Sequence, residues 1–278
     1  MTSAAPLLSD GTPRVLFACG GTGGHVYPAI AIADAVRAAR PGAAVAFAGT
    51  RDRMEWTAVP KAGYPIHAVT VSGFQRGLRP EALRRNATFP LKLAKGLWES
   101  WRLVGSFDAD VVVGTGGYVS GPVGLAAALR GRPLVVQEQN AIAGATNKML
   151  ARRAARVFVG FDATRGDLPT GEAAGNPVRA DLVAAAATPE SRLAARRELG
   201  IDTDAHVLLV TGGSLGAAPL NAALQANLDA LLADDRAVVV WAAGTRYFDA
   251  LRAAMPAHDR LHLVPYLDRM DLAYAAAD

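Results

Sequence analysis

The residues best suited to chemistry stand at the end of a glycine-rich run near the start of the chain. The run is CGGTGGH, residues 19–25, and its last residue is His25. Four glycines let the backbone turn tightly and approach a ligand closely. A helix that starts here would favour an anion and would also favour the neutral imidazole that a base requires. The run predicts either a phosphate-binding loop with a reactive histidine or a structural turn whose histidine only caps or packs.

A second candidate for a catalytic base is Glu138. The run QEQN, residues 137–140, follows an apolar stretch at 133–136 that is typical of a buried strand. Open α/β sheets bind ligands just beyond the carboxyl ends of their strands, so polar residues at this point favour a site. A lone carboxylate is more often a surface or salt-bridged group. Both His25 and Glu138 therefore stay as candidates for the base.

Two further glycine-rich runs repeat the arrangement of the first. GTGGYVSGP, residues 114–122, follows an apolar run at 109–113, and TGGSLG, residues 211–216, follows one at 206–210. The first loop is not a Walker A sequence, and Val26 stands where the dinucleotide-binding pattern needs its third glycine. Three strand–loop–helix units, two in the first half and one in the second, predict a cleft that holds phosphates from both sides.

Strand and helix patterns alternate along the chain, which predicts an α/β fold with parallel sheets covered by helices on both faces. Expected strands lie at residues 14–18, 43–49, 66–71, 109–113, 133–136, 157–159, 206–210, 238–241 and 261–265. Expected helices lie at 26–36, 54–62, 189–199, 217–232, 247–255 and 270–277, with two more that end at 129 and 153. A Gly-, Pro-, Thr- and Asp-rich segment at 166–179 marks a domain boundary. We expect a disordered tail at 1–13, a first domain at 14–175, and a second at 176–278 with only about three strands.

Composition limits the classes of protein that fit. The chain has 278 residues, of which 51% are hydrophobic and 19% charged, as in globular proteins. Its net charge of +4 and pI of about 9.4 do not by themselves indicate a nucleic-acid partner. A single cysteine excludes an internal disulfide, and residues 1–13 lack the features of a signal peptide. No apolar run reaches the roughly 18 residues of a membrane span, so we expect a protein of the cytoplasm or of a membrane face.

The sequence predicts no metal site. Asp108-Ala109-Asp110 and Asp202-Thr203-Asp204 match a metal-binding D-x-D pattern, but both precede strands instead of following them, so we expect solvated loop ends. Cys19 is expected to be a buried residue at a strand end rather than a nucleophile. The remaining histidines show no metal-site spacing: His67, His206, His258 and His262.

The stretch at 73–101 interleaves basic and apolar side chains. It predicts either helices whose apolar faces join the core, or a basic amphipathic site on a membrane surface with tryptophans at headgroup level. The candidate membrane residues are Arg79, Arg84, Arg85, Phe89, Lys92, Lys95, Trp98 and Trp101.

Five motifs together resemble the MurG family of N-acetylglucosaminyltransferases: GGTGGHVYPAIAIA, GTGGYVSGP, QEQNAIAG, GNPVR and GGSLGA. The similarity covers nearly the whole chain from residue 14. It implies a two-domain GT-B fold, in which two Rossmann-like domains face a cleft. It also implies that N-acetylglucosamine moves, with inversion, from UDP-N-acetylglucosamine to the C4 hydroxyl of undecaprenyl-diphospho-N-acetylmuramoyl-pentapeptide. That reaction converts lipid I to lipid II in peptidoglycan synthesis.

The same resemblance implies where the protein works and what it meets there. The expected place is the cytoplasmic face of the bacterial plasma membrane, with peripheral attachment. The expected partners are the two substrates, an anionic membrane surface and other cell-wall synthesis proteins, without a nucleic acid. The resemblance implies neither a cofactor nor a metal.

Matching the family's motifs assigns residues to each substrate. The first domain is expected to hold the acceptor and the second the donor nucleotide. Donor contacts fall on Thr22, Gly23, Gly24, Asn140, Arg179, Ser214 and the backbone of Leu267. Acceptor contacts fall on Gly116, Gly117, Tyr118 and Ser120. The chemistry agrees, because a loop before a helix and an arginine fork both suit a diphosphate, and an asparagine can donate to and accept from sugar hydroxyls.

Two other functions fit parts of the sequence. The run GGSLG, residues 212–216, matches a nucleophile elbow around Ser214, and Asp249 with His258 or His262 would complete a serine hydrolase. In the family the donor domain continues past the point where this chain stops, with groups that grip the ribose and the sugar. We therefore expect residues 1–278 by themselves to behave as an inactive nucleotide-sugar-binding fragment.

Overall fold

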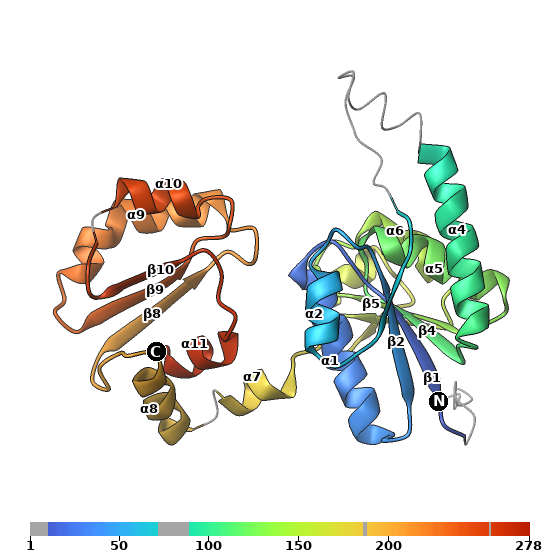
Figure 1. Ribbon diagram of the computed structural model, residues 1–278, viewed down its shortest axis with the longest axis horizontal. Helices are drawn as coiled ribbons and strands as arrows, with labels where there is room; N and C mark the ends of the chain where they lie inside the picture. Colours follow the sequence, from blue (N-terminus) through green and yellow to red (C-terminus); the bar gives the residue numbers. More distant parts are fainter. Residues whose placement is uncertain (1–10, 72–88, 186–187, 256) are drawn as a thin grey trace. The chain divides into compact units, whose positions relative to one another are not determined.

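The computed structural model describes residues 11–71, 89–185, 188–255 and 257–278 (Figure 1). The chain forms two compact units, residues 1–179 and 180–278. Each unit is built on a parallel sheet with helices packed against it, so the predicted α/β class with two Rossmann-like units is confirmed.

Unit 1, residues 1–179, holds a seven-stranded sheet with the order β3-β2-β1-β4-β5-β6-β7, and every neighbouring pair is parallel. Its strands are β1 (Arg14–Ala18), β2 (Ala44–Gly49), β3 (Ile66–Ala68), β4 (Val111–Gly114), β5 (Leu134–Glu138), β6 (Arg156–Val159) and β7 (Glu172–Ala173). Its helices are α1 (Gly23–Ala39), α2 (Glu55–Lys61), α4 (Phe89–Ser106), α5 (Gly117–Leu129), α6 (Ala145–Ala151) and the 3₁₀ helix η1 (Asp162–Gly166).

The core of unit 1 follows from alternation along its strands. In β1, Leu16 belongs to one buried apolar cluster and Phe17 to another, because successive side chains point to opposite faces of a sheet. The Phe17 face is covered by α1 and α2, whose Val26 and Val59 are fully buried. The Leu16 face is covered by α4, α5 and α6.

The strand order of unit 1 reverses beside β1. β2 and β3 lie to one side of β1, while β4 to β7 lie to the other. At such a switch point the connections from two neighbouring strands lead away in opposite directions, which leaves room for a ligand at the carboxyl edge. The two glycine loops of unit 1 follow β1 and β4, so the topology brings them together at this point.

Unit 2, residues 180–278, holds a three-stranded parallel sheet with the order β10-β9-β8. Its elements are α7 (Ala180–Ala185), α8 (Pro189–Glu198), β8 (His206–Thr211), α9 (Ala218–Leu232), β9 (Ala237–Ala242), α10 (Phe248–Ala254), β10 (Leu261–Val264) and α11 (Met270–Ala276). The centre of its core is Trp241, which is fully buried. The Trp241 indole donates a 3.0 Å hydrogen bond to Asn221, so its buried N–H is satisfied.

Several boundaries differ from those expected from sequence; β3, for example, ends at Ala68 and not at residue 71. Helix α1 begins at Gly23, three residues early, because the carbonyl of Thr22 accepts from the N–H groups of His25 and Val26. Strand β5 continues through Glu138, since residues 137 and 138 pair with β6. The structure divides the chain after Arg179, whereas composition placed the boundary after residue 175.

Candidate functional site

The two glycine loops of unit 1 pack directly on each other. Gly117 has φ +80°, and a Cβ added to it would lie 2.2 Å from the carbonyl oxygen of Gly20. Gly116 has φ +106°, and its Cβ would lie 2.8 Å from the ring of His25. Both the backbone conformation and the space therefore require glycine at these two positions. The expected acceptor residues Gly116 and Gly117 thus shape the loop around His25.

His25 lies in the first turn of α1 and is held by two other segments. Its Nδ1 is 3.0 Å from the carbonyl oxygen of Thr115 and 3.0 Å from Oε1 of Gln139. The Thr115 hydroxyl returns a 2.8 Å hydrogen bond to the carbonyl oxygen of His25. The ring is thus fixed through Nδ1, and Nε2 is the ring nitrogen left to meet a substrate.

Glu138, the second candidate for the base, is fully buried at the end of β5. Its Oε1 accepts hydrogen bonds from the backbone and side-chain nitrogens of Asn140, at 2.9 and 2.8 Å. Its Oε2 accepts from the backbone of Gly144 and the side chain of Asn147, both at 2.9 Å. Four donors occupy this carboxylate, so the geometry supports a role in holding the exposed Asn140 rather than in taking a proton from substrate.

Glu55 is a site residue that sequence reasoning missed. It begins α2, is fully buried, and accepts hydrogen bonds from the backbone of Gly21 at 3.1 Å and from the backbone and hydroxyl of Thr50 at 3.1 and 2.6 Å. Its negative charge lies beneath the start of the first glycine loop. An anion at this loop would be repelled less at its later part, residues 22–24, which lies farther along the chain from Gly21. The only sequence signal was an acid at the start of a short helix, which is common and uninformative.

Cys19 is buried at the end of β1, as expected. Burial, and after it the nearby charge of Glu55, raises the pKa of the Cys19 thiol far above its ordinary range. A thiol that stays protonated is not a nucleophile at neutral pH.

The other expected acceptor residues differ in exposure. Tyr118 is 63% exposed and is available to a ligand. Ser120 is fully buried, and its hydroxyl lies 2.7 Å from the carbonyl oxygens of both Ala18 and Gly116. Ser120 is therefore a structural residue that links the end of β1 to the second glycine loop, and its hydroxyl is not available to an acceptor.

The GNPVR motif, residues 175–179, ends at the donor candidate Arg179. The side chain of Asn176, in the GNPVR motif, donates a 3.2 Å hydrogen bond to the carbonyl oxygen of Gln139. The guanidinium of Arg179 lies 5.3 Å from the centre of the Tyr27 ring, within reach of a cation–π interaction. Unit 1 thus ends with Arg179 placed against α1.

The candidate loop of unit 2 is also shaped by glycine. A Cβ on Gly216 would lie 2.1 Å from the carbonyl oxygen of Ala243, so the loop after β8 rests on the loop after β9. Ser214 lies half-buried in this loop, ahead of the 15-residue helix α9. Leu267 packs against the apolar cluster that contains Val207.

The hydrolase alternative gains no support from unit 2. In the part of the chain that the structure describes, no histidine is hydrogen-bonded to Ser214. His258 instead accepts a 3.1 Å hydrogen bond from the backbone of Arg260. Asp249 is exposed on α10.

Helix α4 fits both interpretations of the 73–101 stretch. One face packs on the core, and another is exposed as a membrane-binding face would be. Gly96 lies against the segment that follows β3, where a Cβ would come within 2.1 Å of the carbonyl oxygen of Thr70, and Ser100 and Val104 are fully buried. The other face exposes Trp98, which is 56% accessible, and residues 90–95 are all exposed. Lys92 and Lys95 are among the exposed residues, and Trp101 is partly covered by Arg130 at 4.2 Å. Arg79, Arg84, Arg85 and the side chain of Phe89 lie outside the described residues.

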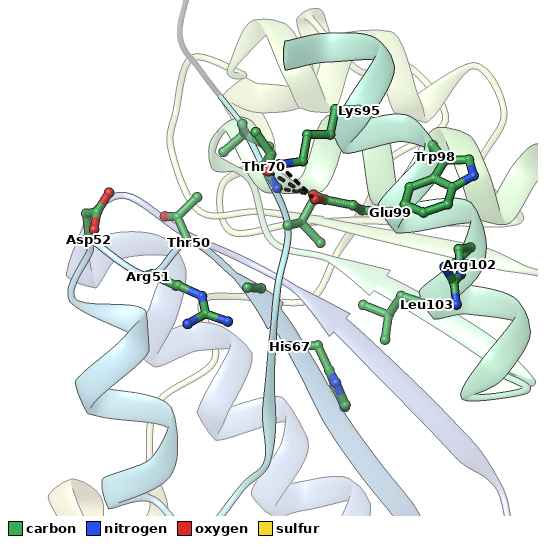
Figure 2. A pocket seen from close by; sticks show the side chains of 13 residues that line it. Thr50, Arg51, Asp52, His67, Thr70, Lys95, Trp98, Glu99, Arg102 and Leu103 are labelled. Atoms are coloured by element: carbon green, nitrogen blue, oxygen red, sulfur yellow. Dashed lines mark hydrogen bonds and ion pairs between the residues drawn. The ribbon is translucent and has the colours of Figure 1, made fainter. Parts of the chain in front are cut away.

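Figure 2 shows a groove of about 720 Å³ between α4 and the carboxyl ends of β2 and β3. Glu99 of α4 ties the two walls together by accepting from the backbone of Thr70 at 2.6 Å, and it also pairs with Lys95 of the same helix at 3.7 Å. Arg102 lies 4.9 Å from the ring of Trp98, which puts a cation and an exposed indole side by side. Thr50 joins the groove to the first glycine loop through Glu55. The labelled lining residues are Thr50, Arg51, Asp52, His67, Thr70, Lys95, Trp98, Glu99, Arg102 and Leu103.

Two parallel-sheet units, each with a glycine loop that leads into a helix, define the class of two-domain Rossmann-like proteins to which GT-B glycosyltransferases belong. A UDP-GlcNAc 2-epimerase from Neisseria meningitidis bound to UDP-GlcNAc shares this fold, with a TM-score of 0.61 and 13% identity over 94% of this chain and 74% of that one. A MurG crystal structure from Acinetobacter baumannii has a TM-score of 0.60 and 32% identity, over 95% of this chain and 71% of that one.

The chain belongs to glycosyltransferase family 28. The N-terminal domain of that family matches residues 15–159 and the C-terminal domain matches residues 207–278. A curated relative from Salinibacter ruber is 52% identical over 98% of this chain and 71% of its own length. Another, from Burkholderia ambifaria, is 44% identical over 93% of this chain and 68% of its own length. Both relatives are named UDP-N-acetylglucosamine–N-acetylmuramyl-(pentapeptide) pyrophosphoryl-undecaprenol N-acetylglucosamine transferase.

Proposed function

We propose that this protein transfers N-acetylglucosamine from UDP-N-acetylglucosamine to the C4 hydroxyl of undecaprenyl-diphospho-N-acetylmuramoyl-pentapeptide. The named activity of relatives that align over nearly the whole chain supports this reaction. The main structural support for the mechanism is the fixed position of His25, whose Nδ1 lies between Thr115 and Gln139. The imidazole is anchored on one side and can take a proton on the other.

In this mechanism Nε2 of His25 accepts the proton of the acceptor's C4 hydroxyl. The oxygen attacks the anomeric carbon of the donor sugar from the face opposite the diphosphate. The bond from that carbon to the diphosphate oxygen breaks, UDP leaves with the electron pair, and the sugar configuration inverts. General base catalysis of this kind contributes about 10²- to 10⁴-fold to a rate.

Negative charge that builds on the leaving UDP needs fixed donors. We assign this task to Arg179 and to the loop that carries Ser214, because an arginine fork and a loop ahead of a helix both favour phosphate oxygens. The backbone of Leu267 is assigned to the uracil. Asn140, which Glu138 holds at the edge of β5, is assigned to hydroxyls of the donor sugar.

The acceptor carries a lipid, so unit 1 has to work at a membrane surface. We assign this contact to the exposed face of α4, where Lys92, Lys95 and Trp98 combine positive charge with an exposed indole. Within the described residues, no helix has the length and apolar character needed to cross a membrane. We propose peripheral attachment on the cytoplasmic face, where the donor nucleotide is available.

The reaction is tested with the full-length gene product, UDP-N-acetylglucosamine and a lipid-linked muramoyl-pentapeptide. We expect His25→Ala to lower kcat by about 10²- to 10⁴-fold while the protein stays folded. The matched control is His206→Ala, because that histidine is exposed at the start of β8 and pairs with Asp234 at 3.0 Å. A wild-type protein that transfers no sugar would contradict the reaction, and a His25→Ala variant with unchanged kcat would contradict the assignment of the base.

A further inference from the structure

Gln139 stands out because its side chain reaches His25 from a strand end 114 residues away in sequence. It is buried, with 8% of its surface exposed, yet it belongs to a loop whose neighbour Asn140 is exposed. A buried amide that contacts the ring of the candidate base requires an explanation, and its hydrogen bonds supply one.

The orientation of the Gln139 amide is fixed by its own donors. Its Nε2 donates to the carbonyl oxygen of Gln137 at 3.2 Å and also contacts the side-chain oxygen of Gln137. Both partners are acceptors, so the nitrogen of the amide faces Gln137 and the oxygen faces His25. Gln137 is itself held, because Asn147 donates to its carbonyl oxygen at 3.3 Å.

Among the residues that the structure describes, Nδ1 of His25 therefore meets two oxygens and no donor. One is the carbonyl oxygen of Thr115 and the other is Oε1 of Gln139, each at 3.0 Å. A ring nitrogen between two acceptors is satisfied only if it carries the hydrogen. In the neutral ring the hydrogen then resides on Nδ1, and Nε2 presents a lone pair.

We infer that Gln139 is a positioning residue that holds His25 in the tautomer with hydrogen on Nδ1, so that Nε2 is ready to accept a proton. This inference rests on the proposed function, in which Nε2 of His25 accepts the proton of the acceptor hydroxyl. Thr115 alone would still accept from Nδ1, and Gln139 adds a second acceptor from a different segment of the chain. The second acceptor removes the alternative ring orientation, which would turn a carbon toward Gln139.

The tautomer is measured directly by long-range ¹H–¹⁵N correlation NMR of the histidine rings in this chain. The spectrum is recorded at a pH where titration shows the ring to be neutral, and His25 is assigned by comparison with a His25→Gln variant. We expect wild-type Nδ1 to show the shift of a protonated nitrogen and Nε2 that of an unprotonated one. The reverse pattern, with hydrogen on Nε2, would overturn the inference without any variant.

Two substitutions then separate a positioning role from mere packing. Gln139→Leu keeps the approximate volume and removes the acceptor, so we expect the Nε2–H tautomer to appear and kcat to fall about 10-fold, as the loss of one hydrogen bond would predict. Gln139→Glu keeps an acceptor oxygen toward His25, so we expect it to retain the Nδ1–H tautomer, although its other oxygen would face the carbonyl oxygen of Gln137 and lower the stability of the fold. Unchanged ring shifts and unchanged kcat in Gln139→Leu would overturn the inference. A wild-type protein without transferase activity would contradict the proposed function, while the NMR result would still decide the role of Gln139.

Discussion

The side-chain nitrogen of Asn147 donates a 2.9 Å hydrogen bond to Oε2 of Glu138, and neither residue is more than 1% exposed. This contact between α6 and β5 closes a ring of donors around a buried carboxylate. Every hydrogen bond that Glu138 makes is an accepted one. The arrangement supports the proposed division of roles: among the described residues no hydrogen bond reaches Nε2 of His25, whereas each oxygen of Glu138 accepts two.

Replacing Glu138 with glutamine is expected to destabilise unit 1. The new amide nitrogen would face two donors, either those of Asn140 or those of Gly144 and Asn147, which we expect to cost about 2–4 kcal/mol of unfolding free energy. The measurement is chemical unfolding together with kinetics. The control is Glu172→Gln, because Glu172 is half-exposed and its pair with Arg156 is a surface one. A Glu138→Gln protein of wild-type stability but greatly reduced kcat would favour Glu138 as the base.

Replacing Glu55 with glutamine should disturb donor binding through the first glycine loop. One of the backbone N–H groups of Gly21 and Thr50 would lose its acceptor, at a cost of about 1–3 kcal/mol. We expect lower thermal stability and a raised KM for UDP-N-acetylglucosamine. Glu99→Gln is the matched control, because Glu99 also accepts from a threonine backbone and hydroxyl, those of Thr70, but away from that loop. Equal donor KM values in the two variants would show that Glu55 supports only the fold.

Adding a methyl group at Gly116 should act on His25 directly. Gly116 has φ +106° and ψ −174°, a conformation that costs other residues about 1–3 kcal/mol, and its new Cβ would displace the imidazole. We expect Gly116→Ala to lose most of its kcat. In Gly131→Ala the φ is also positive, at +68°, but the Cβ would meet open space, so stability should fall while kcat stays near wild type. Similar kcat values in both variants would contradict the close packing of Gly116 on the ring.

The stability of unit 1 should depend on pH through Asp167, which accepts a hydrogen bond from Ala143 in the loop after β5. The side chain of Lys148, and after it the backbone N–H of Ala143, holds the pKa of Asp167 below its ordinary value. A carboxyl whose pKa is lower in the folded state stabilises that state above its unfolded pKa of about 3.9. That contribution is lost as the pH falls through the lowered value. We expect wild type to be more stable than Asp167→Asn at pH 7 and the difference to vanish in strong acid. Denaturant unfolding at a series of pH values checks this, and a difference that is constant with pH would refute it.

Helix α4 should bring unit 1 to anionic vesicles. Each basic residue close to such a surface contributes about 1 kcal/mol, reduced by salt. We expect Lys92→Gln with Lys95→Gln to weaken vesicle binding by more than tenfold at low salt, and Trp98→Ser to weaken it at any salt. Vesicle sedimentation is the measurement. Arg197→Gln with Arg246→Gln removes the same charge from exposed positions of unit 2 and should have little effect. Binding that ignores the anionic lipid content would exclude this role for α4.

The sequence by itself determined the elements and the family. The apolar runs of β1, β4 and β9 and the glycine run before α1 are local patterns, and local patterns set local structure. The five motifs, met in order, identified the family because each is a run of neighbouring residues. The buried end of β1 at Cys19 followed from the same local argument.

Only the tertiary structure decided which of the candidate side chains can act. The contact between Gln139 and His25, the burial of Glu138 and Glu55, and the seat of Gly117 on Gly20 all depend on the strand order β2-β1-β4-β5, which brings together segments far apart in sequence. The sequence does not distinguish a carboxylate at a strand end that is exposed to water from one that is buried among four hydrogen-bond donors. The neighbours that long-range strand pairing supplies decide between the two, and for Glu138 they are four hydrogen-bond donors, which supports the proposal that His25 is the base.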